Sequence, residues 1–597
     1  MLRTIYFKII MSKPLRPLHP VSRPCLLLLT LGLLLVPALS GCASLTRLSR
    51  PGEISVGEVK ETPQSLAYYH YLKAQRLILA DDPEGALREY EAALQEDPSA
   101  ATMELETALL YQRQGEVKKA LAHVEKALKL DPKLQDAYFL LAGLHVGLNQ
   151  LEEAIQEYER ILVLDPENRE ARLFLATLYA QQRRYPKAIR AIQEILRLDP
   201  QSVVGYYYLG RFYLEIDKVE EAKKEFLRVL SMDAKFVPAI FDLAVALERE
   251  KQYSRALSMY RRVLRHQPSN ARAWTNIGRI YLILNRYSDA QKAFRKVKTL
   301  EKNDAGAQFN IGLICLEQKL PEDAIKELRP LLVNPRYQNR ARYYIAMALE
   351  EKGDLKAACR EYRLVDRDSE QFVPAWLRLA YLHYQLGEKD QARRVLDDLR
   401  TLAPQREEIY LTESYFFEEE NLWDRAIKAL QAGLSKVDRP AEIYYRLAVL
   451  YEKTNNREES IKNIKKVLEL DPENPDAQNF LGYSYAETGA NLNEAEKLVK
   501  AALRTKPESG HIIDSLGWIY YKKGEFDKAA AELERARKIM PQDGTVAEHL
   551  ADAYVRLKRY REALRLYRQA EDLENADVIQ LRKKIKKLEQ LQQGRGI

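Results

Sequence analysis

The sequence predicts an all-α fold, a right-handed α-solenoid of about fifteen helix pairs, and two repeating features carry this prediction. A 34-residue period runs from residue 67 to residue 577, with a single unit of 35 residues. The eighth and twentieth places of each unit hold small residues, mostly Ala or Gly. A period in this range is typical of stacked supersecondary units rather than of one globular core.

Each unit predicts two helices joined by a polar turn. In the unit 271–304, Trp274, Ile277 and Tyr281 recur at spacings of three and four, and a second apolar stripe begins at Ala290. The small residues are expected where the two helix backbones approach most closely. A longer side chain at these places would cost roughly 1–3 kcal/mol through overpacking.

These repeats resemble tetratricopeptide repeats, whose pattern is Trp-x2-Leu-Gly-x2-Tyr, then Ala-x3-Phe-x2-Ala, then Pro. The resemblance covers fifteen units and implies that the first helix of every unit faces a concave groove. The residues that match most closely are Trp274, Ile277, Gly278, Tyr281, Ala290, Phe294 and Val297 in unit seven, and Leu516, Gly517, Tyr520, Ala529, Ala536 and Pro541 in unit fourteen.

The amino-terminal segment predicts export and a lipid anchor. A basic stretch precedes a short apolar run at 25–36, and Leu39-Ser40-Gly41-Cys42 follows. This motif resembles a bacterial lipobox, which implies acylation of Cys42; an ordinary secretory signal is the alternative. Ala43, rather than an aspartate, follows the cysteine, which favours the outer membrane facing the periplasm. The start stays open between Met1 and Met11.

Irregular places are expected in two of the units. Unit eight ends early near Asn334, and unit eleven carries Gly433, so we expect the weakest stacking and a bend there. The carboxyl end is expected to cap the last unit with Leu581 and its apolar neighbours, leaving Lys584 and the other cations in water.

The expected organisation of the chain has five parts. The parts are 1–41, a signal peptide that is removed; 42–66, a flexible tether; 67–406, units one to ten; 407–577, units eleven to fifteen; and 578–597, a capping helix and tail.

Composition excludes several function classes. The chain has 94 basic and 86 acidic residues, net +8, and removing the five basic charges of 1–41 leaves +3. This balance argues against a nucleic-acid partner. No catalytic or phosphate-binding motif is present in the sequence, and its eight histidines are scattered, so we expect no enzyme activity, metal or cofactor. Cys315 and Cys359 are expected in the core, with a disulfide between them left open.

The candidate site is the groove that the resemblance implies. The second, fifth, ninth and twelfth places of each first helix are expected to point into it, and they are rich in aromatic residues, which supply contact area at low entropic cost. The alternative is that the fifth-place rings brace a neighbouring helix, an alternative expected least for Tyr384, Trp518 and Tyr521. The candidate groove residues are Tyr68, Tyr71, Phe139, Tyr207, Arg211, Phe241, Arg279, Phe309, Tyr343, Tyr381, Tyr384, Tyr415, Tyr445, Tyr483, Trp518 and Tyr521.

The last repeats, from Asn479 through Trp518 to His549, are similar to those of proteobacterial tetratricopeptide lipoproteins. Some members of that group recruit carboxyl-terminal processing proteases and their substrates. The sequence therefore favours a non-catalytic scaffold or adaptor, anchored in the outer membrane, that binds periplasmic or envelope proteins. The alternative is a structural part of an envelope machine for exopolysaccharide export, pilus secretin assembly or β-barrel assembly. A cytosolic repeat protein with a misread start is the third reading.

Overall fold

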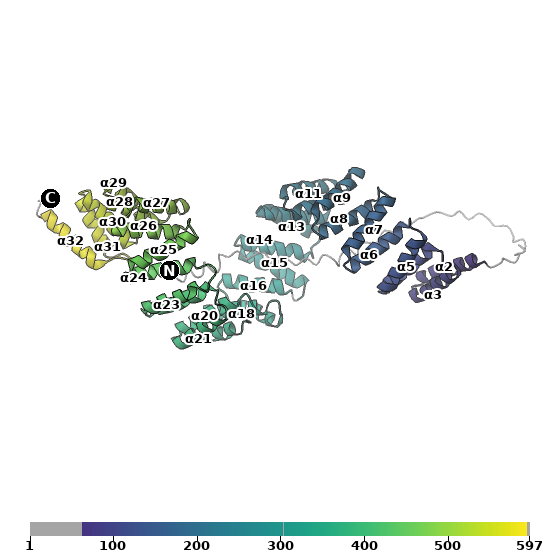
Figure 1. Ribbon diagram of the computed structural model, residues 1–597, viewed down its shortest axis with the longest axis horizontal. Coiled ribbons are helices and arrows are strands. Elements are labelled where there is room, and N and C mark those ends of the chain that lie inside the picture. Colours follow the sequence, from purple (N-terminus) through teal and green to yellow (C-terminus); the bar gives the residue numbers. More distant parts are fainter. Residues whose placement is uncertain (1–61, 303, 594–597) are drawn as a thin grey trace, which may run out of the picture. The chain divides into compact units, whose positions relative to one another are not determined.

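The computed structural model describes residues 62–302 and 304–593, and in these ranges the chain is helical with no β-strand (Figure 1). The described residues form two compact units, divided along the chain between Pro166 and Glu167. The predicted signal peptide, Cys42 and most of the tether lie outside the described residues. No helix of the described ranges is long and apolar enough to cross a bilayer. The predicted α-solenoid of helix pairs is confirmed.

The described part of the first unit contains three helix pairs. Its first helix begins at Pro63, four residues earlier than expected, because the Thr62 side chain accepts a hydrogen bond from the Ser65 backbone while Ser65 bonds back to Thr62. The pairs are α2 Pro63–Leu79 with α3 Pro83–Glu96, α4 Ala101–Arg113 with α5 Val117–Leu130, and α6 Gln135–Gly147 with α7 Leu151–Leu164.

The second unit contains the remaining repeats, and each first helix begins within one residue of the predicted period. The pairs are α8 Arg169–Gln181 with α9 Tyr185–Leu198, α10 Val203–Glu215 with α11 Val219–Met232, α12 Val237–Arg249 with α13 Tyr253–His266, α14 Ala271–Ile283 with α15 Tyr287–Leu300, α16 Ala305–Glu317 with α17 Pro321–Leu328, α18 Gln338–Lys352 with α19 Leu355–Arg363, α20 Phe372–Gln385 with α21 Lys389–Leu402, α22 Glu407–Glu419 with α23 Trp423–Leu434, α24 Ala441–Lys453 with α25 Arg457–Leu470, α26 Pro475–Thr488 with α27 Leu492–Thr505, α28 Gly510–Lys523 with α29 Phe526–Ile539, and α30 Gly544–Arg556 with α31 Tyr560–Ala570, followed by α32 Val578–Gln593.

Close contact between the paired helices explains the small residues of the repeat. A methyl group added at Gly517 would lie 2.6 Å from the Leu533 side chain and 3.3 Å from the carbonyl oxygen of Ala529, the twentieth-place residue. At Gly210 the corresponding distances are 2.7 Å to Phe226 and 3.3 Å to a backbone carbonyl. The predicted close approach of the two backbones is therefore confirmed, and the residue sixteen places later fills the space that the glycine leaves.

The two irregular units differ in structure. In unit eight, α17 ends at Leu328 and a 3₁₀ helix, η1 Arg329–Val333, replaces its last turns. Pro330 explains this change, because proline lacks the backbone N–H that an α-helix interior needs. In unit eleven, α23 is regular, and Gly433 makes room for the Tyr410 ring. The expected bend and weak stacking at these places stay predictions.

The capping helix α32 covers the last repeat through Leu581 and Leu588, both of which are buried. Lys584 does not stay in water as expected. Its ammonium group bonds Asp552 at 2.6 Å and Glu548 at 2.7 Å, both on α30. The two carboxylates draw the lysine inward, which the apolar pattern of α32 could not indicate.

Candidate partner-binding groove on the first helices

In the second unit, side-chain contacts join each first helix from α20 to α30 to the next. Each of these contacts joins two successive first helices, so the first helices together form one floor. Moving along the chain, the contacts are Tyr384 stacked on Phe416 at 4.3 Å, Glu418 paired with Arg446, Tyr445 edge-on to Phe480 at 6.1 Å, Glu487 accepting from the Trp518 indole, and Asp514 bonded to His549 at 3.1 Å.

The structure places the sixteen predicted groove residues in three exposure classes. Tyr68, Arg211 and Arg279 are exposed, while Phe241, Phe309, Tyr343 and Trp518 are buried, each less than a tenth exposed. The remaining nine are partly exposed, and these are Tyr71, Phe139, Tyr207, Tyr381, Tyr384, Tyr415, Tyr445, Tyr483 and Tyr521. The predicted role of these residues in binding a partner is a separate matter and stays a prediction.

The four buried rings brace the repeats instead of offering free surface. Phe241 lies edge-on to Tyr260 at 5.4 Å, and the Arg272 guanidinium covers it at 4.8 Å. Phe309 packs against Tyr344 of the next first helix at 5.6 Å. The burial of these rings favours the alternative that they brace the helices, and their predicted place in the groove stays a prediction.

The two exposed arginines of the candidate set are paired with carboxylates of a neighbouring repeat. Arg279 on α14 bonds Glu248 on α12 at 2.7 Å, and Arg211 on α10 lies 3.8 Å from Asp242 on α12. Tyr207 also donates its hydroxyl to Asp242 at 3.0 Å. These side chains therefore link successive first helices while their outer parts face solvent.

Trp518 is the centre of a stack in the last repeats. Its ring lies parallel to His549 at 4.1 Å and to Tyr521 at 4.8 Å, and its indole N–H donates to Glu487. The expectation that Trp518 and Tyr384 are not bracing residues is wrong, since each stacks on a ring of the following first helix. Tyr521 differs, because its ring stacks on Trp518 of its own helix at the partly exposed end of the stack.

Electrostatics in this part of the groove favour a protonated histidine. Burial alone would lower the pKa of His549, but the Asp514 carboxylate outweighs burial, and the pKa of His549 is raised above its usual 6.5. Burial, together with Glu419, raises the pKa of Tyr415 to about 12. Burial, together with Asp476, raises the pKa of Tyr445 to about 12. The tyrosine hydroxyls therefore stay protonated and can donate hydrogen bonds to a partner.

The first unit offers a smaller aromatic surface. Tyr68 and Tyr71 stack at 6.2 Å on α2, and Tyr71 also contacts the buried Tyr90 ring on α3 at 5.9 Å. Phe139 on α6 lies edge-on to Tyr158 on α7 at 5.8 Å. Only Tyr68 of these predicted residues is largely free of packing, with 58% of its surface exposed.

Sequence reasoning missed the charged pairs that join the first helices. Glu350 pairs with Arg378, and Glu418 pairs with Arg446 at 3.0 Å. Both pairs join the twelfth place of one repeat to the sixth place of the next, a spacing of 28 residues. An acid recurring 28 residues before a base is the signal that could have revealed them.

The two cysteines of the described residues and His383 are buried in the core. Cys315 and Cys359 are free thiols, both buried, with no disulfide between them, and burial raises the pKa of each. His383 is buried and bonds Glu388 at 2.6 Å. Across residues 62–302 and 304–593, no three His, Cys, Asp or Glu side chains gather as a metal site would require.

Comparison with known proteins agrees with this architecture. Family models described as tetratricopeptide repeat together match about two thirds of the chain. The matched residues are 71–135, 136–203, 204–236, 241–306, 284–334, 374–406, 441–474 and 520–587.

Two curated relatives share part of the sequence. The TPR repeat-containing protein PA4667 of Pseudomonas aeruginosa is 30% identical over 213 residues, which is 36% of this chain and 36% of that protein. The human protein O-mannosyl-transferase TMTC1 is 26% identical over 179 residues, 29% of this chain and 20% of that protein. The chain thus spans about a third of the first relative and a fifth of the second.

Solved structures include similar helical repeats. The chain is 17% identical to a chain of the Cut9-Hcn1 hetero-tetramer of the APC/C, with a TM-score of 0.34, covering 76% of this chain and 96% of that one. A tetratricopeptide repeat protein from Parabacteroides merdae is 20% identical, with a TM-score of 0.35, covering 42% and 98%. From its repeat period, its helix pairs and the matching family models, the chain belongs to the tetratricopeptide repeat family.

Proposed function

We propose that the chain is a non-catalytic scaffold that holds extended or helical segments of other proteins along the first helices of its last six repeats. The observation that carries the proposal is a series of six partly exposed tyrosines on five consecutive first helices, α20 to α28: Tyr381, Tyr384, Tyr415, Tyr445, Tyr483 and Tyr521. Half-buried tyrosines are held in place by packing, so they lose little entropy when a partner binds.

The surroundings of these rings support a protein partner. Each ring has an apolar body beside its neighbours and a hydroxyl group, a combination that is enriched at protein interfaces. Glu487 and Asp514 on the same first helices are already bonded to Trp518 and His549. A partner would therefore meet a preformed floor, which limits the entropy lost on binding.

We also propose that Cys42 is acylated and anchors this scaffold in the outer membrane, facing the periplasm. The Leu39-Ser40-Gly41-Cys42 motif supports the anchor, and Ala43 supports the outer-membrane choice. Periplasmic or envelope proteins are then the partners, and a carboxyl-terminal processing protease with its substrates is the pairing that the resemblance suggests. Cys42→Ser should release the chain into the soluble fraction, and persistence in the membrane fraction would rule the anchor out.

The groove is tested by removing two tyrosine rings that are not part of the buried stack. Tyr415→Ala with Tyr483→Ala should reduce the recovery of partner proteins in quantitative affinity capture from envelope extracts. The matched control is Tyr185→Ala with Tyr253→Ala, which removes two partly exposed rings from the second helices α9 and α13. Trp518 is unsuitable for this purpose, because it is buried and its loss would destabilise the fold.

The capture experiment tests the groove and distinguishes between the two proposed roles. Depletion of the same proteins by the groove variant, but not by the control, supports the groove. Equal recovery with both variants contradicts it. A protease recovered with its substrates would favour the adaptor, whereas a secretin or polysaccharide pore would favour the role in an envelope machine.

A further inference from the structure

Charge is concentrated in one stretch of this otherwise balanced chain. Residues 251–302 contain thirteen Lys and Arg but only two acidic residues, Asp289 and Glu301. The whole chain has 94 basic and 86 acidic residues, so the stretch alone exceeds the net charge of +8. It corresponds to α13, α14 and α15. Arg279, Arg286 and Lys298 pair with acids, and the remaining cations leave an excess of positive charge on these helices.

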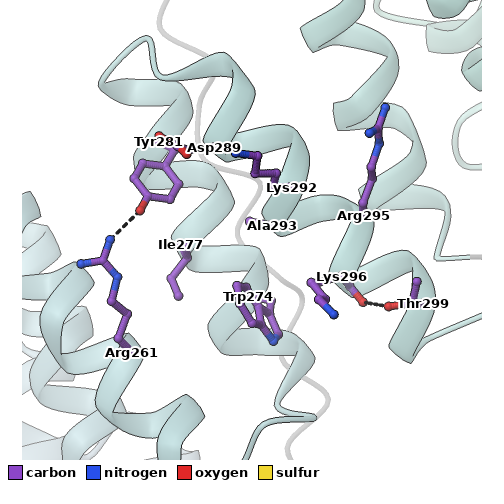
Figure 2. A pocket seen from close by; sticks show the side chains of 10 residues that line it. All are labelled: Arg261, Trp274, Ile277, Tyr281, Asp289, Lys292, Ala293, Arg295, Lys296 and Thr299. Atoms are coloured by element: carbon purple, nitrogen blue, oxygen red, sulfur yellow. Dashed lines mark hydrogen bonds between the residues drawn. The ribbon is translucent and has the colours of Figure 1, made fainter.

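A pocket opens within this positive stretch, between α13, α14 and α15. Its volume is about 550 Å³, in the range of sites that enclose a small ligand or a few side chains. Ile277 and Ala293 are buried and form an apolar floor, and Trp274 is partly exposed beside them. Figure 2 shows Trp274, Ile277 and Tyr281 between Arg261 on one side and Lys296 on the other.

The cations that line the pocket have no acidic partner among the described residues. Lys292, Arg295 and Lys296 are exposed and form no ion pair there. Arg261 donates to the Tyr281 hydroxyl at 2.6 Å, a neutral acceptor (Figure 2). The one carboxylate that lines the pocket, Asp289, is held by Arg286 at 2.6 Å. Four positive charges therefore surround the opening without compensation.

The pocket lies on the opposite side of α14 from the groove. Trp274, Ile277 and Tyr281 occupy the fourth, seventh and eleventh places of the repeat, whereas Arg279 occupies the ninth. At 3.6 residues per turn, these two sets point to opposite sides of the helix. A ligand in the pocket would therefore leave the groove residues of this repeat free.

The polar atoms of the aromatic walls are already engaged. The Trp274 indole donates to the Pro268 carbonyl at 3.1 Å, and the Arg286 guanidinium covers the Tyr281 ring at 4.7 Å. A nucleobase or sugar on Tyr281 would compete with Arg286 for the ring face and with Arg261 for the hydroxyl. An apolar side chain resting on Ile277 and Ala293, with carboxylates beside it, fits the site better. Tryptophan, tyrosine and arginine are also the residues that dominate binding energy at protein interfaces.

We propose that this pocket docks an acidic segment of a partner protein, with one apolar side chain in the pocket and flanking carboxylates on Arg261, Lys292, Arg295 and Lys296. The proposal rests on the scaffold role above but uses a different face. The chain would then hold two protein segments at once, one on each side of its helices.

The probe for the test is a short fluorescein-labelled peptide with glutamates around a central Leu-Phe pair, measured by fluorescence anisotropy. Lys292→Ala, Arg295→Ala and Lys296→Ala together should weaken its binding about tenfold, since each lost contact between opposite charges weakens binding. The control removes the same charge elsewhere, by Lys583→Ala, Lys586→Ala and Lys587→Ala on the exposed face of α32. Replacing Leu-Phe in the peptide by Gly-Gly should also weaken binding.

Equal affinity for both triple variants would overturn the proposal. So would tighter binding of an oligouronate or a single-stranded oligonucleotide than of the acidic peptide, because those probes represent a different class of ligand. The groove variant Tyr415→Ala with Tyr483→Ala should bind the peptide like the wild type. Failure of the pocket and failure of the groove can therefore be told apart.

Discussion

The groove of the last repeats and the pocket of α13 to α15 use charge in opposite ways. In the groove, Glu418 and Asp514 are buried and bonded to Arg446 and His549 on the next first helix. In the pocket, Lys292 and Lys296 face solvent without an acidic partner among the described residues. Charge in the groove holds neighbouring repeats together, whereas charge at the pocket is available to a ligand. Pairing, and not the number of charges, distinguishes the two faces.

The largest effect is expected where the groove loses a buried partner. Asp514→Ala leaves His549 buried without its acceptor and should cost about 2 kcal/mol of stability. Urea unfolding followed by tryptophan fluorescence measures this cost, because Trp518 is stacked on His549. The matched control is Asp476→Ala, which breaks an exposed pair with Lys506. If both variants lose the same free energy of unfolding, the Asp514–His549 pair contributes no more to stability than a surface pair does.

A smaller effect is expected from pH, because both partners then remain in place. The pKa of His549 is raised in the folded chain by Asp514, with Asp552 and Glu548 adding to it. The folded state therefore binds a proton more tightly than the unfolded state, so the stabilisation is complete below pH 6.5 and decreases as pH rises through the raised pKa. Urea midpoints at a series of pH values should show this decrease, and His549→Gln should remove it. A midpoint that rises over the same range would contradict the assigned sign.

The smallest effect on stability is expected at the pocket. Lys292→Ala, Arg295→Ala and Lys296→Ala together break no ion pair and should change the free energy of unfolding by less than about 0.5 kcal/mol. The same urea experiment measures this change. A loss as large as that of Asp514→Ala would mean that the pocket cations support the fold, and the contrast between the two faces would fail.

The helix pairs were predictable because their cause is local and repeated. Gly210 and Gly517 indicate a close approach between the two helices of one repeat, and the structure shows that approach. Burial at the groove depends on contacts with the next repeat. Trp518 and Phe309 occupy places that face the groove by helical geometry, yet His549 and Tyr344 of the following helices cover them. A residue count along one helix cannot show what the next helix places over it.

The prediction that Lys584 stays in water is wrong for the same reason. Its own helix predicts a solvated cation, but Glu548 and Asp552 on α30 lie within reach of its ammonium group. The pocket was not foreseen either, because the net charge of the whole chain hides a local excess. A window of about fifty residues moved along the sequence would have revealed the thirteen cations of 251–302.

The turn inside each helix pair has a practical consequence for anyone who handles this chain. This turn places one residue in the left-handed region of backbone conformation. In some repeats that residue is glycine, and in others it is a lysine, namely Lys251 (φ 59°), Lys319 (φ 57°) and Lys558 (φ 63°). An L-residue with a side chain pays roughly 1 kcal/mol for this conformation, which glycine adopts freely. Replacing these lysines by glycine should give a more stable protein for crystallisation, with the residues of the groove and the pocket unchanged.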